Sequence, residues 1–283
     1  MPVIKVEDVG KYYGGARGVE NLSFEVDGGE IYGFLGPNGA GKTTTIKILV
    51  KIIKDYDGKA EVFDRDLKDW GKDYYQKIGV SFEFPAIYSK LTALENLEFF
   101  SSFYKKHLDP AEVLKMVGLG NEGDRLAAEF SKGMKKKLDL ARSLLPDPDI
   151  LFLDEPLEGL DPGSARKIKD LLLEMKDSGK TVFLTTHNMY VADELCDRVA
   201  FLVEGAMRLA GNPKELKTNM GRGLVKVEHS AGGSVEIDEF PLEGLGQNKK
   251  FLGILQDDEI RRINTEEPTL EEIFLKVTGR RLV

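Results

Sequence analysis

The sequence predicts an α/β protein: a mixed sheet with flanking helices, an inserted helical subdomain and a small α+β appendage at the C-terminal end. Three observations indicate this fold class. Short apolar runs alternate with amphipathic stretches, as in parallel strands joined by helices. A glycine-rich turn separates one such strand from a helix. The pattern becomes helical over about residues 84–145. We expect a main domain over 1–220 that contains this insertion, and an accessory domain over 221–283.

The N-terminal elements read as strands. Residues 3–6 and 22–26 alternate with the period of a β-strand, and residues 30–35 form an apolar run typical of a buried strand. After the glycine-rich turn we expect a helix that continues to about Lys54. A turn at Asp57-Gly58 then leads into a short strand over 60–63.

The inserted segment has two clear helix starts. Thr92 and Glu95 have the spacing of a capping box. Asp109 and Pro110 open a second helix, which Gly118 closes. After Thr92, large apolar side chains fall at helical spacing, and we expect this stripe to be core packing rather than a cofactor site. The stripe consists of Leu94, Leu97, Phe100 and Phe103.

The α/β pattern resumes after the insertion. Residues 150–153 and 181–184 are short apolar runs, consistent with buried parallel strands. An amphipathic helix is expected between them over 164–178, and a further strand over 199–203. From about residue 221 the chain has glycine pairs and short alternating runs, which predict the small α+β appendage.

A phosphate-binding loop of the form G-x-x-x-x-G-K-[ST] lies between the strand at 30–35 and the helix after it. Glycines let successive backbone N–H groups of residues 39–44 face one anion. Lys42 can reach the β- and γ-phosphates, and the Thr43 hydroxyl can bind Mg²⁺. The positive end of the helix dipole faces the same phosphates. The loop residues are Gly36, Pro37, Asn38, Gly39, Ala40, Gly41, Lys42, Thr43 and Thr44.

Acidic and basic side chains follow two of the later strands. Asp154 and Glu155 end the apolar run at 150–153, at the sheet edge where α/β proteins bind ligands. Asp154 can hold Mg²⁺ or its water, and Glu155 is the candidate general base for an attacking water. His187 follows the next strand on the same edge and is expected to contact the terminal phosphate. His107 and His229 have no such setting and are assigned no role.

Composition limits the classes of protein that the chain can be. Its 283 residues are 41% hydrophobic, enough for a sizeable core, and its formal net charge is −8. This acidic balance argues against nucleic acid or an anionic membrane as the main partner. We find no leader and no apolar run that could span a bilayer, and expect an intracellular protein. The single cysteine, Cys196, is expected to be a buried structural thiol.

A further motif suggests a family. The segment from Phe130 to Met134, which includes Ser131 and Gly133, precedes Asp154 by about twenty residues and resembles the LSGGQ signature of ABC transporters. Nearly the whole chain resembles the ATP-binding subunit of such a transporter. By this resemblance, Ser131 and Gly133 contact the γ-phosphate of ATP held by a second copy of the chain. This role is consistent with the residue type, because Ser131 can cap a helix whose N–H groups face an anion.

The resemblance assigns roles to other positions. Tyr13 matches the aromatic residue that stacks on adenine, with Tyr12 as the competing candidate. Glu83 stands where the family commonly has a glutamine that senses Mg²⁺ and the membrane partner. Asp161, in the segment 158–161, matches the stretch that crosses to the other subunit, and His187 matches the family's switch histidine.

Two positions depart from the family pattern. Lys132 replaces the first signature glycine, which puts the affinity of the dimer in doubt. Glu83 in place of glutamine still offers an oxygen to Mg²⁺ but adds negative charge near Asp154 and Glu155. The lysines at 135–137 are expected to be a solvated helix face rather than phosphate ligands.

Together these features predict an ATPase subunit, with ATP and Mg²⁺ as its ligands, that powers a separate integral membrane permease. It is expected in the cytoplasm, held at the inner face of the cell membrane through that permease. The capped helix that begins near Thr269 resembles the terminal helix of exporter subunits and favours export. One alternative is an ABC-type ATPase in DNA repair or translation, but those typically have two ATPase halves or a coiled coil. Another is a regulatory module without turnover, which Asp154, Glu155 and His187 disfavour. The sequence does not indicate the substrate.

Overall fold

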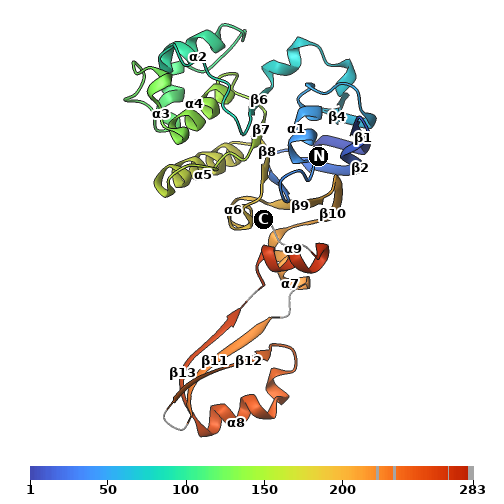
Figure 1. The fold of residues 1–283 in the computed structure, drawn as a ribbon, viewed down its shortest axis with the longest axis vertical. Coiled ribbons are helices and arrows are strands. Elements are labelled where there is room, and N and C mark those ends of the chain that lie inside the picture. Colours follow the sequence, from blue (N-terminus) through green and yellow to red (C-terminus); the bar gives the residue numbers. More distant parts are fainter. Residues whose placement is uncertain (221–222, 232–233, 267, 280–283) are drawn as a thin grey trace. The chain divides into compact units, whose positions relative to one another are not determined.

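The computed structural model describes residues 1–220, 223–231, 234–266 and 268–279. The chain forms two compact units (Figure 1), one over Met1–Ala210 and another that begins at Gly211. Helix α7 (Pro213–Met220), expected in the main domain, therefore belongs to the second unit. The reason is local packing, since α7 contacts α9 (Leu270–Thr278) and the Lys276 ammonium donates to the Met220 carbonyl.

The first unit contains a six-stranded sheet in the order β10-β9-β3-β8-β7-β6. The central strands pair in parallel: β3 with β8 and β9, and β7 with β8 and β6. Every residue of β3, β7 and β8 is buried, which explains their continuous apolar runs. The parallel pairing brings the carboxyl ends of these strands to one edge. The strands are β3 (Ile31–Leu35), β6 (Ile78–Ser81), β7 (Ile150–Asp154), β8 (Thr181–Thr186), β9 (Arg198–Val203) and β10 (Ala206–Gly211).

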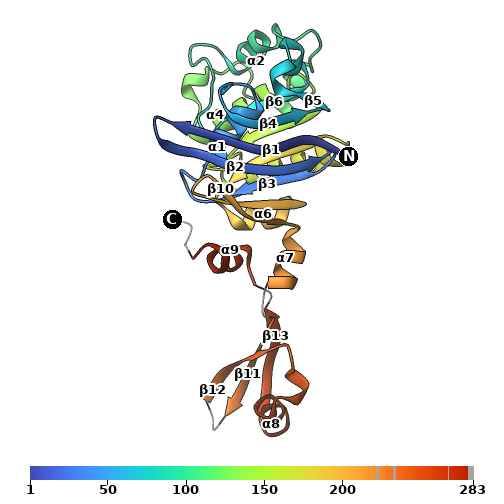
Figure 2. The ribbon, with the colours of Figure 1, turned by 90° about the vertical axis from the view of Figure 1, so that its right-hand side faces the viewer.

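A second, antiparallel sheet lies beside the first (Figure 2) in the order β2-β1-β4-β5. Aromatic rings join the two sheets: Phe24 of β2 packs 4.9 Å from Phe34 of β3, and Phe34 packs 5.0 Å from Phe183 of β8. Two short 3-10 turns, η1 (Leu67–Asp69) and η2 (Lys72–Gln76), follow β5. The strands are β1 (Pro2–Tyr13), β2 (Ala16–Asp27), β4 (Asp57–Val62) and β5 (Arg65–Asp66).

The helix after the glycine-rich turn, α1 (Lys42–Leu49), ends earlier than the sequence predicts. The expectation of a helix to about Lys54 is wrong. Lys51 has a φ of 60°, in the left-handed region, which stops the helix. The N–H groups of Ile52 and Ile53 then both donate to the Lys47 carbonyl and close the turn.

Three α-helices and a 3-10 turn make up the inserted segment: α2 (Ala93–Ser101), α3 (Pro110–Met116), η3 (Ala127–Glu129) and α4 (Lys132–Leu144). The predicted helix starts are confirmed. Thr92 and Glu95 form a full capping box, and Asp109 accepts hydrogen bonds from the first turn of α3. Ser131 caps α4.

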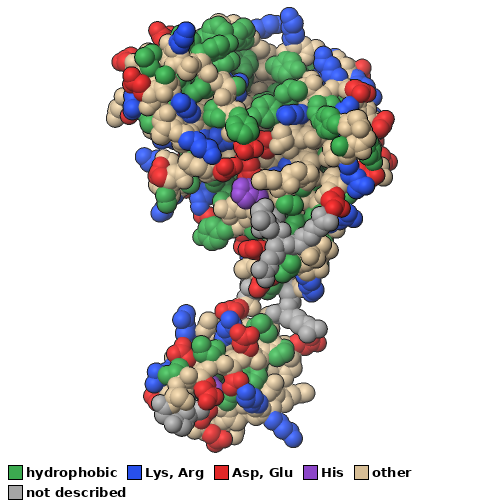
Figure 3. All heavy atoms as spheres, viewed as in Figure 1, with side chains coloured by type: hydrophobic (Ala, Val, Ile, Leu, Met, Phe, Trp, Pro, Cys, Tyr) green, Lys and Arg blue, Asp and Glu red, His purple; other side chains and the backbone are tan. Residues whose placement is uncertain are grey.

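The predicted core packing of the aromatic stripe holds for only part of it. Leu97 is fully buried, and Leu94 and Phe100 are half-buried, whereas Phe103 is 64% exposed. Phe99, which is not part of the stripe, is 40% exposed. Helix α2 ends at Ser101, so Phe103 lies beyond the last turn and does not share the buried face. The rings of Tyr88, Phe99 and Phe103 instead pack on one another at the surface, and hydrophobic side chains are visible over this segment (Figure 3).

Two further helices flank the main sheet, α5 (Pro162–Asp177) and α6 (Met189–Leu195). Helix α5 begins two residues earlier than predicted because Asp161 caps it and Pro162 suits its first position. Cys196 follows α6 and is buried, as expected. Burial raises the pKa of its thiol far above the usual value. A Cβ atom at Gly33 would lie 2.6 Å from the Cys196 sulfur, so these two residues pack closely.

The second unit contains a three-stranded antiparallel sheet, in the order β12-β11-β13, with α8 (Lys249–Asp257) on one face. The strands are β11 (Leu224–Ala231), β12 (Ser234–Pro241) and β13 (Glu259–Glu266), and a 3-10 turn, η4 (Leu245–Gln247), precedes α8. Its small core is formed by Val225, Val227, Phe240, Phe251 and Ile254. Helix α9 begins with the predicted capping box at Thr269.

None of the helices in the described parts of the chain is long and apolar enough to cross a lipid bilayer.

Candidate nucleotide-binding site

The turn between β3 and α1 requires glycine at two positions. A Cβ atom at Gly36 would lie 2.2 Å from the Leu202 carbonyl oxygen, and one at Gly41 would lie 2.5 Å from the Gly18 carbonyl oxygen. Gly41 also has a φ of 104°, which a side chain would strain. Helix α1 begins directly after Gly41, so its first N–H groups, which have no partner within the helix, face the turn. This strand, turn and helix form an anion-binding loop.

Lys42, the first residue of α1, has a buried side chain that folds back over the loop. Its ammonium donates to the carbonyl oxygens of Gly36 at 2.6 Å and Pro37 at 3.3 Å. The same ammonium lies 3.5 Å from Glu155 Oε1. A lysine held by backbone carbonyls at this position has its charge directed at the loop's anion site.

Asp154 ends β7 with its carboxylate facing the start of α1. Its Oδ2 accepts a hydrogen bond from the Thr43 hydroxyl at 2.7 Å, and its Oδ1 accepts one from the Thr185 hydroxyl. Asp154 is 2% exposed. A hydroxyl and a carboxylate this close offer hard oxygen ligands of the kind that Mg²⁺ prefers.

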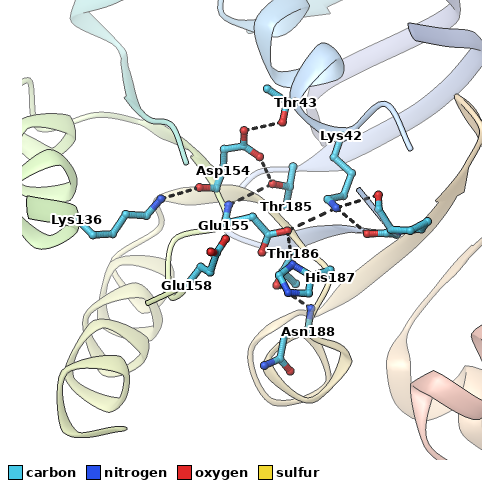
Figure 4. A network of polar contacts seen from close by, with 12 residues as sticks. Lys42, Thr43, Lys136, Asp154, Glu155, Glu158, Thr185, Thr186, His187 and Asn188 are labelled. Atoms are coloured by element: carbon cyan, nitrogen blue, oxygen red, sulfur yellow. Dashed lines mark hydrogen bonds and ion pairs between the residues drawn. The ribbon is translucent and has the colours of Figure 1, made fainter. Parts of the chain in front are cut away.

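Glu155 follows Asp154 and has a φ of 48°, a left-handed conformation that is rare outside glycine and concentrated at functional sites. Its N–H donates to the Thr185 carbonyl at 3.1 Å. Its Oε1 lies 3.0 Å from His187 Nδ1 on one side, with the Lys42 ammonium on the other. Figure 4 shows Lys42, Glu155 and His187 converging from three separate elements.

Lys42, Thr43, Asp154 and Glu155 line a cleft of about 360 Å³. His187 and Thr185 do not line it but contact Glu155 and Asp154, which do. The cleft brings together the phosphate loop, Glu83, Asp154 and Glu155, which the sequence predicted as one site. Tyr13 lines it, whereas the competing Tyr12 does not and instead hydrogen-bonds Glu20 at 2.5 Å. The lining residues are Tyr13, Arg17, Gly18, Pro37, Asn38, Gly39, Ala40, Gly41, Lys42, Thr43, Thr44, Glu83, Asp154 and Glu155.

Comparison with known proteins identifies the family to which the chain belongs. Residues 19–158 match the family model described as ABC transporter. A fluoroquinolones export ATP-binding protein of Mycobacterium tuberculosis is 48% identical over 93% of this chain and 88% of its own length. The chain belongs to the ABC transporter family of ATP-binding proteins. It is therefore an ABC ATPase, which binds and hydrolyses ATP.

Other relatives of this ABC ATPase are named as transport or drug-resistance ATP-binding proteins. A bacitracin transport ATP-binding protein of Bacillus licheniformis is 34% identical, over 98% of this chain and 97% of its own. A daunorubicin/doxorubicin resistance ATP-binding protein of Streptomyces peucetius is 33% identical, over 99% and 94%. Residues 223–267 match a second model, described as fluoroquinolone efflux ABC transporter C-terminal domain.

Solved structures support the fold of the ABC ATPase. An ATP-binding subunit of an ABC transporter has a TM-score of 0.71 at 28% identity, over 77% of this chain and 93% of that one. A bacterial ABC transporter cassette solved as a dimer has a TM-score of 0.69 at 28% identity, over 74% of this chain and 98% of that one. The predicted fold class is thereby confirmed.

Five predicted site residues of the ABC ATPase do not line the cleft. Gly36 and His187 contact its lining residues Lys42 and Glu155. The other three, Ser131, Gly133 and Asp161, lie at the starts of two helices. Ser131 caps α4 and accepts a hydrogen bond from the Met134 N–H at 3.2 Å. Asp161 caps α5 and accepts one from the Ser164 N–H at 2.9 Å, and these contacts lower its pKa. Gly133 packs against the Gly159 carbonyl, which would be 3.2 Å from a Cβ atom at Gly133. The starts of α4 and α5 thus lie together, apart from the loop.

Lys132, the departure from the signature pattern, has an exposed side chain that turns toward Glu158, with Nζ 3.3 Å from Oε1. Its alkyl chain lies against Gly159. The Lys132 side chain therefore contacts the segment 158–161 and does not extend freely over the start of α4.

Sequence reasoning missed three residues of the site. Thr185, which contacts both Asp154 and the Glu155 N–H, lies in β8 directly after the predicted run at 181–184. Its position near the carboxyl end of that strand could have indicated its place on the shared edge. Arg17 and Gly18 line the cleft from β2 and have no local signature.

The burial of Lys136 contradicts a further expectation. The lysines at 135–137 were expected on a solvated face, but Lys136 is 4% exposed. Its ammonium donates to the carbonyl oxygens of Phe82 at 2.9 Å, Glu83 at 3.2 Å and Asp154 at 3.0 Å. Burial lowers the pKa of Lys136 from its usual value. This one side chain therefore joins α4, the segment after β6 and the end of β7.

Replacing Lys136 with Met is expected to lower the free energy of unfolding by about 2–4 kcal/mol, because three buried carbonyls lose their shared donor. Chemical denaturation measures the change. The neighbouring Lys135→Met variant serves as the control and is expected to stay within about 0.5 kcal/mol of the wild type. Equal stability of the two variants would contradict the role assigned to Lys136.

Proposed function

We propose that the chain is the ATPase subunit of an export system, in which two copies act with a separate membrane permease. The supporting observation is the 48% identity to a fluoroquinolones export ATP-binding protein, which extends over 93% of the chain. The separate match of residues 223–267 to a fluoroquinolone efflux C-terminal domain adds to it. We further propose fluoroquinolone-like drugs as the first class of substrate to test, and the inner face of the cell membrane as the place of action.

In this proposal the phosphate loop and Lys42 hold the phosphates of ATP, and Tyr13 stacks on the adenine. Glu155 removes a proton from the attacking water. Its carboxylate is buried, aimed into the cleft and fixed by the contact to His187. His187, through its remaining ring nitrogen, stabilises the γ-phosphate.

The residues at the cleft also fit Mg²⁺. We propose that Thr43, Asp154 and Glu83 hold the ion directly or through water, since Thr43 and Asp154 already place a hydroxyl and a carboxylate 2.7 Å apart. When bound, Mg²⁺ neutralises charge on the phosphates. The chain's own part is to orient these oxygens through the contacts of Asp154 to Thr185 and of the Asp154 carbonyl to Lys136.

The pairing of two copies is supported by the residues that lie outside the cleft. Ser131, Gly133 and Asp161 gather at the starts of α4 and α5, where free helix N–H groups suit an anion. We propose that they meet the ATP held by the second copy. A related cassette that was solved as a dimer supports this arrangement.

The proposal is tested in cells that carry the chain and its natural permease. We expect the tagged chain to co-purify with a polytopic membrane protein from solubilised membranes. Cells in which Glu155→Gln replaces the wild type should accumulate more of a fluorescent fluoroquinolone. Unchanged accumulation of fluoroquinolones would refute that substrate class. Recovery of the chain with ribosomes or DNA, and without a membrane protein, would refute the transport function itself.

A further inference from the structure

The core of the second unit contains a buried histidine. His229 lies on β11 and is 2% exposed. It follows Val225 and Val227 at the strand period, so it belongs to the same inner face of the sheet as these two core residues. A buried imidazole must find polar partners, because an unpaired polar group in an apolar core is costly.

The partners of His229 are carboxylates. Its Nε2 lies 3.2 Å from Asp238 Oδ2 on the neighbouring strand β12. Its Nδ1 lies 2.8 Å from Asp258 Oδ2, an ion-pair distance, without a well-directed hydrogen bond. Glu236 stands directly opposite His229 in the register of β11 and β12. Ligand atoms of His229, Glu236 and Asp238 all lie within 4.8 Å of one another.

Negative charge is in excess in this cluster. The only ammonium that contacts these carboxylates in the described residues is that of Lys250, which pairs with Asp238 Oδ1. This contact lowers the pKa of Asp238 and leaves its Oδ2 directed at His229. With the His229 imidazole neutral, the form that binds a metal, Glu236, Asp238 and Asp258 together exceed Lys250 by two negative charges. A divalent cation would balance this excess.

We propose that His229, Asp238 and Glu236 bind a divalent transition-metal ion, for which Zn²⁺ is the first candidate. The ligands would be His229 Nε2 and one oxygen from each carboxylate. Two ligands at about 2.0–2.2 Å from a tetrahedral centre are separated by about 3.4 Å, close to the 3.2 Å between His229 Nε2 and Asp238 Oδ2. The imidazole favours Zn²⁺ over Mg²⁺ and Ca²⁺, which prefer oxygen alone.

Asp258 has a different part in this site. A metal-bound histidine usually donates its other ring N–H to a carboxylate, which fixes the tautomer that can bind the metal. Asp258 Oδ2, 2.8 Å from His229 Nδ1, is the carboxylate near enough for this part, and the contact is an ion-pair distance rather than a directed hydrogen bond. The metal would then link β11 to β12. Through Asp258, the residue directly after α8, it would also link these strands to the end of that helix. Such a cross-link would stabilise a unit whose apolar core is small.

The experiment titrates Zn²⁺ into the full-length, chelator-treated chain, with calorimetry to measure affinity and elemental analysis to measure stoichiometry. We compare the wild type with Glu236→Gln, Asp258→Asn and Glu239→Gln. Glu236 is exposed, so its variant should fold normally. Glu239 pairs with Lys226 and is not part of the cluster, so its variant is the matched control on the same strand.

We expect the wild type and Glu239→Gln to bind one Zn²⁺ more per chain than Glu236→Gln. Asp258→Asn should lower the affinity about 10–100-fold. Zn²⁺ held at the carboxylates of the nucleotide cleft is common to all variants and cancels in the comparison. X-ray absorption of the wild type should show one imidazole among the oxygen ligands. Equal affinity and stoichiometry in all four proteins, or no Zn²⁺ bound by the wild type, would overturn the proposal.

Discussion

Replacement of Glu155 by Gln is expected to slow ATP hydrolysis by about 10²–10⁴-fold, the usual contribution of a positioned general base, and to leave ATP binding intact. The amide keeps the shape of the side chain and removes its basicity. The phosphate loop and Asp154 are unchanged in this variant. Phosphate release measures the rate, and binding of a fluorescent ATP analogue measures the affinity.

The neighbouring Glu158→Gln variant is the matched control. Glu158 lies three residues along the same segment but pairs with Lys132 rather than with Lys42 or His187. It should keep nearly the wild-type rate. On the proposal that two copies close on ATP, the Glu155→Gln chain should also accumulate as a dimer in light scattering, because it does not hydrolyse the ATP that holds the pair closed. Full turnover in the Glu155→Gln chain would show that another group is the base.

Replacement of Lys42 by Met is expected to weaken ATP binding at least about 30-fold, since loss of one partner from a buried charge pair costs about 2–5 kcal/mol. The Lys42 ammonium is buried and held by the Gly36 carbonyl. Arg17, the other cation among the described residues that line the cleft, contacts Glu20 and the Glu204 carbonyl instead. The effect should appear in the dissociation constant for ATP, measured by equilibrium titration, as well as in the rate.

Lys47 on the same helix gives a suitable control for Lys42. It lies in the last turn of α1 and does not line the cleft. Lys47→Met changes the net charge by the same amount, so it separates loss of local charge from loss of overall charge. Similar ATP affinities for the two variants would argue that Lys42 does not bind the phosphates.

Much of the fold could be predicted because its signals are local. The turn from Gly36 to Gly41 needs glycine for reasons of close backbone approach, and Thr92 and Thr269 cap their helices through residues three positions away. The edge that gathers Asp154, Glu155 and His187 also follows from sequence, since the carboxyl ends of parallel strands must meet.

The errors arose from contacts with distant segments and from helices that end earlier than their periodicity predicts. Lys136 looks like one lysine in a solvated run, yet its acceptors come from residues 82, 83 and 154, far along the chain. Phe103 fits a helical stripe, but the helix stops before it. His229 lacks any motif, and its carboxylate partners become neighbours only through strand pairing and the end of α8. Periodicity alone cannot supply these contacts.

The burial of Cys196 has a practical consequence for experiments on this protein. It is the only cysteine in the chain, and its sulfur is packed against Gly33 rather than exposed to reagents. A single cysteine introduced at the surface, for example at Asp177 at the end of α5, would therefore be the one site that accepts a fluorophore or spin label. Distances between two copies could be measured during turnover without first removing the native thiol.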